Sequence, residues 1–209
     1  MTTILMMAGA IGLAHLQRLV LVGQALREQG ANVVFAYREA HAILQQHAFP
    51  THVVPDLTPP TRFADNVFAQ YTPELIEACV RREREVIEEV RPDVIVGDFR
   101  PTAAISTRLA RVPFVAIVNA YMTDAFDPVE ALATSGGKVQ NRAASFIGKQ
   151  IQKQQKRSLA APFRQVARAH GLNDLQSLYD FFSGTLTLLA ELPEFCPLPH
   201  LPASHRYVG

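Results

Sequence analysis

The stretch that decides the fold is TILMMAGAIGLAHLQRLVLVGQALREQGANVVFAY, residues 3–37. It begins with the apolar run Thr3–Ala8, which the glycine-containing turn Gly9–Gly12 closes. From about His15 to Gln29 apolar residues recur near a 3.6-residue period, which predicts a helix that Gly30 ends. The β-rich run Asn32–Tyr37 follows. A strand, a helix and a strand in this order form a βαβ unit, and its crossover makes the two strands parallel.

The same rhythm continues along the chain. Further strands are predicted near Thr51–Val54, at Asp93–Gly97, at Pro113–Val118 and at Thr185–Ala190. Helices are predicted at Arg38–His47, Pro73–Val90, Thr102–Ala110, Lys138–Arg157, Pro162–His170 and Leu175–Phe182. Apolar strands without polar alternation indicate a sheet that helices cover on both faces.

The expected architecture is therefore an α/β, Rossmann-like domain over residues 1–192. Its sheet is twisted, mainly parallel and built from about six or seven strands. Four prolines, at positions 193, 197, 199 and 202, then change the composition. We expect an extended linker over 193–209.

Composition excludes several classes of protein. Among 209 residues, 48% are hydrophobic and 20 Lys+Arg oppose 19 Asp+Glu, so neither extended disorder nor a general attraction to nucleic acid is predicted. The two cysteines, Cys79 and Cys196, exclude a disulfide scaffold and favour a reducing compartment. The apolar start is shorter than a membrane span and lacks the basic residues of a signal peptide. We therefore expect a cytoplasmic protein.

His15 and Asp98 are the candidate catalytic pair. Both follow predicted strands, and ligands of open parallel sheets bind beyond the carboxyl ends of the strands. A carboxylate on one imidazole nitrogen fixes the tautomer, so that the other nitrogen can take a proton from a hydroxyl. The alternative is structural: His15 satisfies local backbone groups, and Asp98 caps the next helix.

Motifs for other chemistry are absent from the sequence. It contains no GxGxxG, GxxxxGK[ST] or GxSxG, so NAD, P-loop and serine-hydrolase sites are not supported. His41, His47 and His52 lack the spacing that converges on a metal and are interpreted as surface residues. We expect neither a metal nor a resident cofactor.

One region is strongly basic. No acidic residue lies between Ala131 and Asn173, whereas eight Lys and Arg residues lie within 138–168. This region either contacts an anionic substrate or membrane surface, or is a solvated helix face.

The order of motifs resembles family 1 GT-B glycosyltransferases, including bacterial antibiotic and macrolide glycosyltransferases. The resemblance is carried by the turn GLAH at 12–15, the helix and strand through QGANVVF at 29–35, RPDVIVGDF at 91–99, VPFV at 112–115, NAY at 119–121, PEF at 193–195 and HRYVG at 205–209. Where the family commonly has glycine before the histidine, this chain has Ala14.

The resemblance implies the N-terminal, acceptor-binding half of a GT-B fold. It implies that His15 is the general base and that Asp98 orients it. Gly12, Asn119, Tyr121 and Phe126 are then expected to contact a hydroxyl-bearing acceptor. A nucleotide sugar, held by a donor-binding domain that this sequence does not contain, is the expected co-substrate, and the reaction would invert the anomeric carbon.

The sequence leaves two other functions open. The chain is either a non-catalytic, acceptor-binding or partner subunit of a split glycosyltransferase, or, less favoured, a protein that uses the basic 138–168 region at a membrane surface.

Overall fold

The computed structural model describes residues 1–9, 12–57, 71–126, 158–198 and 200–209. Within these residues the core is one sheet of seven parallel strands in the order β3-β2-β1-β4-β5-β6-β7. The strands are β1 (Thr3–Ala8), β2 (Asn32–Tyr37), β3 (Thr51–Val53), β4 (Val94–Asp98), β5 (Phe114–Val118), β6 (Leu186–Leu189) and β7 (His205–Tyr207). The predicted α/β, parallel architecture is confirmed.

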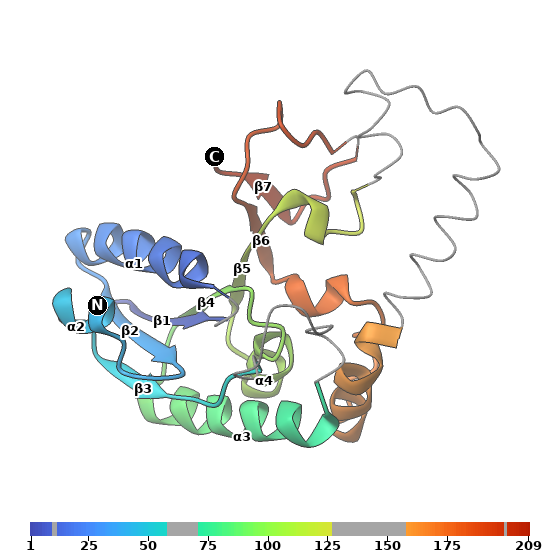
Figure 1. Cartoon of the computed structure of the whole chain (residues 1–209), viewed down its shortest axis with the longest axis horizontal. Helices are drawn as coiled ribbons and strands as arrows, with labels where there is room; N and C mark the ends of the chain where they lie inside the picture. Colours follow the sequence, from blue (N-terminus) through green and yellow to red (C-terminus); the bar gives the residue numbers. More distant parts are fainter. Residues whose placement is uncertain (10–11, 58–70, 127–157, 199) are drawn as a thin grey trace.

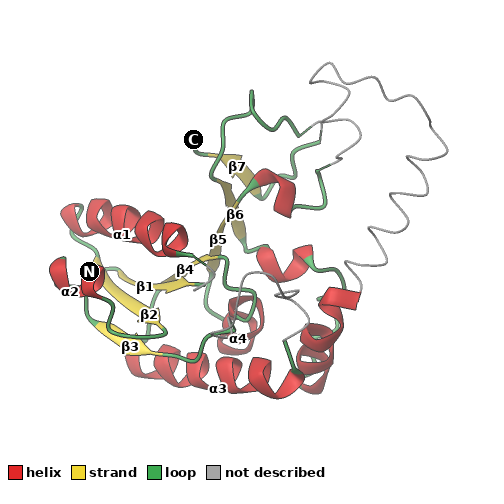
Figure 2. Cartoon of the chain, in the orientation of Figure 1, coloured by secondary structure: helices red, strands yellow, loops and turns green. Residues whose placement is uncertain are grey.

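Helices cover both faces of the sheet, as Figures 1 and 2 show. α1 (Leu13–Glu28) and α2 (Ala42–Gln46) pack on one face. α3 (Pro73–Val90), α4 (Ala103–Ala110) and a helix at 158–169 pack on the other. Two short 3₁₀ helices follow β5 and precede β6, namely η2 (Ala120–Met122) and η3 (Tyr179–Phe182).

β1 shows how the sequence builds two cores. Its side chains alternate between the faces: Leu5 and Met7 join the cluster under α3 and α4, whereas Ile4, Met6 and Ala8 join the cluster under α1. All five are buried. Burying a large apolar side chain stabilises a fold by about 1.5–3 kcal/mol, so an uninterrupted apolar strand is stable only between two layers of helices.

α3 has the bounds that the sequence predicts. The Thr72 hydroxyl accepts a hydrogen bond from Leu75 N at 3.3 Å, and Pro73 occupies the first turn, where its missing N–H is not needed. The helix ends at Arg91, whose backbone is left-handed with φ 51°.

Two predicted helices are shorter than expected. In the first, the His41 ring accepts from Ile43 N, so the helix begins at Ala42 instead of Arg38. In the second, the Asp180 carboxylate accepts from the backbone N–H of Gln176 and of Ser177, both at 2.7 Å. Because side-chain acceptors satisfy these N–H groups, the segment from Leu175 folds as turns and reaches a helix only at η3.

The proline-rich segment contributes a strand to the sheet. β7 pairs in parallel with β6 over three residues, and the buried His205 lies within it. Part of 193–209 is therefore packed into the sheet rather than being a free linker. The predicted helix at Lys138–Arg157 and the second part of the loop Asn119–Gly137 lie outside the described residues.

Candidate active site

The candidate site lies where the strand order reverses direction. β1 and β4 are neighbours in the sheet, although β2, β3 and α3 lie between them in the chain. Their last ladder pair joins Ala8 to Asp98, and the chain after β1 enters α1, which carries His15 in its first turn. Ligands of doubly wound sheets bind at such a point.

The structure brings His15 and Asp98 into contact. His15 Nδ1 lies 2.8 Å from Asp98 Oδ1. Asp98 is 1% exposed, whereas the His15 side chain is 19% exposed. A buried carboxylate thus faces a ring that keeps partial contact with solvent. The helix-capping alternative for Asp98 is wrong, because Thr102 occupies the position before α4 and the carboxylate points to α1.

A third residue joins this pair. Arg18 Nε lies 3.2 Å from Asp98 Oδ2 and forms an ion pair with it, although Oδ2 accepts no hydrogen bond from the described residues. Arg18 is three residues after His15, which places both on the same side of α1. That spacing is the only sequence signal for Arg18.

Phe99 packs against the imidazole. The rings of His15 and Phe99 stack with centroids 5.0 Å apart and planes 22° apart, and Phe99 also contacts Phe182. The Phe99 backbone is left-handed, with φ 51°. Gly9 makes this turn possible, because a Cβ at Gly9 would lie 2.0 Å from the Phe99 carbonyl oxygen.

A buried polar cluster follows directly in the chain. The Glu83 carboxylate of α3 accepts from Arg100 Nε at 2.7 Å and from the Thr102 and Ser106 hydroxyls. Burial is the largest single influence and acts to lower the pKa of Arg100, but the attraction and hydrogen bond of Glu83, together with the attraction of Cys79 and Asp56, raise that pKa overall. The guanidinium therefore stays charged, with Glu83 as its counter-ion.

The four residues expected on the acceptor side differ in their surroundings. Gly12 precedes α1, and a Cβ there would meet nothing within 4 Å. Asn119 follows β5, and its amide donates to Glu191 at 3.2 Å. Tyr121 is 53% exposed, and Phe126 is partly exposed. In the described part of the chain, no hydrogen bond or ring contact joins these residues to His15.

Other chemistry finds no support among the described residues. No group of three or more His, Cys, Asp or Glu side chains there could hold a metal ion. His41 caps α2, His47 contacts Gln24, and His52 contacts Glu89. Burial raises the pKa of the Cys79 thiol to about 12, which makes it a poor nucleophile. None of the described helices is both long enough and apolar enough to cross a bilayer.

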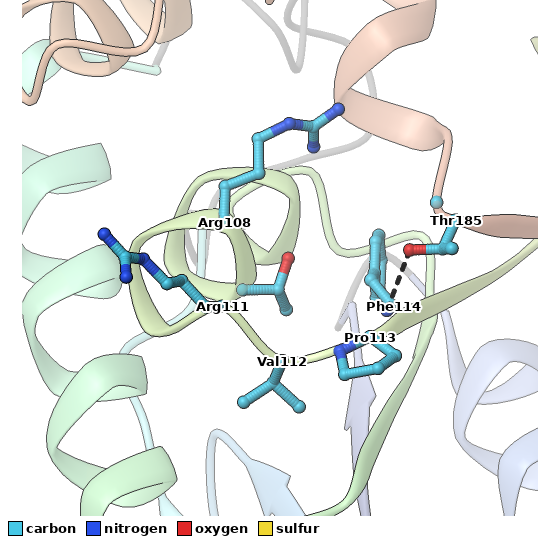
Figure 3. Close-up of a pocket in the computed structure, with 8 residues that line it drawn as sticks. Arg108, Arg111, Val112, Pro113, Phe114 and Thr185 are labelled. Carbon is cyan, nitrogen blue, oxygen red and sulfur yellow. Dashed lines mark hydrogen bonds between the residues drawn. The ribbon is translucent and has the colours of Figure 1, made fainter.

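A pocket of about 420 Å³ lies elsewhere, at the amino ends of β5 and β6. Figure 3 shows the Phe114 N–H donating to the Thr185 hydroxyl on one side of it, while the guanidinium groups of Arg108 and Arg111 point in different directions. Arg108 already pairs with Asp174 at 3.0 Å. Because the pocket lies at the amino ends of strands and His15 lies at their carboxyl ends, the pocket is separate from the candidate site.

Comparison with known proteins identifies relatives by sequence and solved structures with the same fold. The chain is 31% identical over 219 residues to the PGL/p-HBAD biosynthesis rhamnosyltransferase of Mycobacterium bovis (strain BCG / Pasteur 1173P2), covering 99% of this chain and 47% of that protein. It is 29% identical over 216 residues to the inactive PGL/p-HBAD biosynthesis glycosyltransferase of the same strain, covering 99% and 58%. The chain thus spans about half the length of these relatives. No protein-family model matches it.

Two solved structures share the fold. The calicheamicin glycosyltransferase CalG4 superposes with a TM-score of 0.62 at 14% identity, covering 100% of this chain and 52% of that one. The spinosyn rhamnosyltransferase SpnG, complexed with thymidine diphosphate, superposes with a TM-score of 0.54 at 16% identity, covering 98% and 49%. The chain therefore has the fold of one half of a GT-B glycosyltransferase and is homologous to about half the length of the mycobacterial PGL/p-HBAD proteins.

Proposed function

We propose that this chain is the acceptor-binding half of an inverting glycosyltransferase. The observation that carries the proposal is the 2.8 Å contact between His15 Nδ1 and Asp98 Oδ1 at the strand ends of β1 and β4. The carboxylate holds Nδ1 as the protonated nitrogen, so that Nε2 is the basic one. Within the described residues, Nε2 has no hydrogen-bond partner.

The proposed reaction follows from this tautomer. Nε2 of His15 takes the proton of an acceptor hydroxyl as the oxygen attacks the anomeric carbon of a nucleotide sugar. The bond between that carbon and the nucleotide phosphate breaks, and the phosphate leaves with the electron pair. Asp98 stabilises the imidazolium that forms. Gly12, Asn119, Tyr121 and Phe126 would line the acceptor, and the open space at Gly12 lets a substrate approach the turn.

The donor is proposed to sit on a second domain that follows the linker. Because positioning of two substrates supplies much of such catalysis, this chain alone should show little transfer. The name of one relative, a rhamnosyltransferase, makes a rhamnosyl nucleotide the first donor to test.

The test combines the chain with the second half of the mycobacterial rhamnosyltransferase, as a mixture and as a fusion, and measures sugar transfer to a panel of small hydroxyl-bearing acceptors. We expect transfer by the parent and a loss of about 100-fold or more for His15→Ala. Equal turnover in the parent and in His15→Ala would remove His15 from the mechanism.

The second candidate is a non-catalytic acceptor-binding or partner subunit. It is favoured by one observation: a relative 29% identical to this chain is named inactive. In that case the parent binds an acceptor or a donor-binding protein, and no combination of halves transfers sugar. Acceptor binding measured by calorimetry, together with the transfer assay, separates the two candidates.

A further inference from the structure

We propose that the buried ion pair between Glu83 and Arg100 positions the His15 imidazole, acting through Phe99. This inference rests on the proposed function, in which His15 is the base. Glu83 and Arg100 do not touch the reacting atoms and are positioning residues. Three contacts in series carry the argument.

The first contact anchors the chain after β4 to α3. Glu83 is 0% exposed, and both of its oxygens are occupied by groups from residues 100–106. Arg100 also donates from Nη2 to the Pro55 carbonyl at 2.7 Å. A buried ion pair adds little stability over an apolar pair of the same volume, so this arrangement is better explained by the geometry that it fixes.

The second contact is the backbone of Phe99, between Asp98 and Arg100. A left-handed backbone costs a non-glycine residue about 1–2 kcal/mol, so this turn must be held from both sides. On one side the Gly9 N–H donates to the Asp98 carbonyl at 2.8 Å. On the other side Glu83 holds the Arg100 side chain.

The third contact is the stacking of Phe99 on His15. Phe99 covers a face of the imidazole while Asp98 holds Nδ1, so the ring is fixed in both tilt and rotation. Both constraints come from adjacent residues of the turn that Glu83 anchors. Loss of the anchor would let the Phe99 backbone relax and would free the imidazole to tilt. An error of about 1 Å in such a group can cost about 100-fold in rate.

The experiment observes His15 directly, by NMR of its ring protons and nitrogens in the chain as it stands. Phe99→Leu removes the aromatic ring, so the His15 resonances of this variant show the complete loss of the ring-current shift that Phe99 causes. Glu83→Gln keeps the shape of the side chain and removes its charge. The matched control is Glu77→Gln, which lies on the same helix and removes a partly exposed contact to His170 at 2.9 Å.

We expect Glu83→Gln to move the His15 resonances more than half-way toward their positions in Phe99→Leu, at temperatures well below unfolding. Glu77→Gln should leave them in place. A merely structural ion pair would lower the melting temperature of Glu83→Gln and leave the His15 resonances of the folded protein unchanged, which would overturn the proposal.

The transfer assay with the second half adds a kinetic readout. Glu83→Gln and Phe99→Leu should each lower kcat about tenfold or more and leave the acceptor KM unchanged. Phe99→Leu retains the ion pair, so it tests the stacking step even if Glu83→Gln does not fold. A parent-like kcat in Phe99→Leu contradicts the inference, whereas full transfer by His15→Ala contradicts the proposed function itself.

Discussion

At the scale of single residues, the site is organised around one carboxylate. Asp98 Oδ1 faces His15 and Oδ2 faces Arg18, and almost none of the side chain reaches solvent. Both residues follow predicted strands, His15 after the glycine-containing turn of the first and Asp98 at the end of the fourth, and this position in the sequence identified them. Arg18 was not found because a single arginine on an amphipathic helix is usually a solvated residue.

Asp98→Asn tests the charge of the carboxylate without changing its size. The amide no longer selects the His15 tautomer, so transfer in the two-half assay should fall about 100-fold to 10,000-fold. The control is Asp93→Asn, whose carboxylate accepts from Thr3 N at the other end of the same strands. A loss of similar size in both variants would mean that the effect is not specific to the site.

Arg18→Met tests the second partner of Asp98. It leaves the buried Asp98 carboxylate without its arginine counter-charge, which should lower the free energy of unfolding by about 1–3 kcal/mol in urea titrations. Arg84→Met removes an exposed pair with Glu88 at 3.7 Å and should cost at most about 1 kcal/mol. Equal effects of the two changes would show that Arg18 contributes no more than a surface charge.

At the scale of elements, prediction succeeded where one periodic pattern decides the structure. The β1–α1–β2 unit and α3 follow from apolar spacing alone. It failed for Arg38–His47 and Leu175–Phe182. The side chains of His41 and Asp180 accept hydrogen bonds from nearby backbone N–H groups, which competes with the longer helices. Glu83 was missed within the charged run RREREVIEEV, residues 81–90, although it lies on the apolar side of α3 with Ile76 and Cys79.

The turn between β1 and α1 offers a matched pair of glycine substitutions. Gly9→Ala places a Cβ 2.0 Å from the Phe99 carbonyl oxygen, so the strands must shift, and we expect a loss of about 1–3 kcal/mol in the free energy of unfolding. Gly12→Ser enters open space with an extended backbone, φ −164°, and serine is a favoured residue before a helix. It should keep the parent stability and lower transfer by obstructing the acceptor. Parent-like stability in Gly9→Ala would refute the close approach of this turn to Phe99.

At the scale of the whole molecule, the proline-rich segment shows what composition alone misses. The prolines between 193 and 202 indicated an extended linker that packs on nothing, yet His205–Tyr207 adds a parallel strand to the sheet. Such pairing depends on β6, a strand outside the proline-rich segment, so the composition of that segment does not reveal it. The predicted boundary between a domain at 1–192 and a linker at 193–209 stays a proposal.

The buried His205 gives the attachment of β7 a pH dependence. Burial lowers the pKa of His205 below its ordinary value of 6.5, so the unfolded chain binds this proton more readily than the folded one. The stability that His205 contributes is therefore present above pH 6.5 and is lost as the pH falls toward the lower folded value. The Val208 N–H donates to the Leu189 carbonyl and reports on the attachment of β7. When the pH is lowered from about 7.5 to about 5.5, hydrogen exchange at Val208, corrected for the intrinsic exchange rate, should accelerate more in the parent than in His205→Gln. Identical pH dependence in the two proteins would exclude His205 as the cause.

The strand order has one more consequence. In the described structure the outermost strands, β3 and β7, are each three residues long, whereas the inner strands β1 and β2 have six. An exposed edge recruits other polypeptides through its unpaired backbone groups, and short edges are one way in which native sheets limit that recruitment. The longer, apolar strands β1 and β2 are thus kept in the interior of the sheet, where a neighbouring molecule cannot extend the ladder.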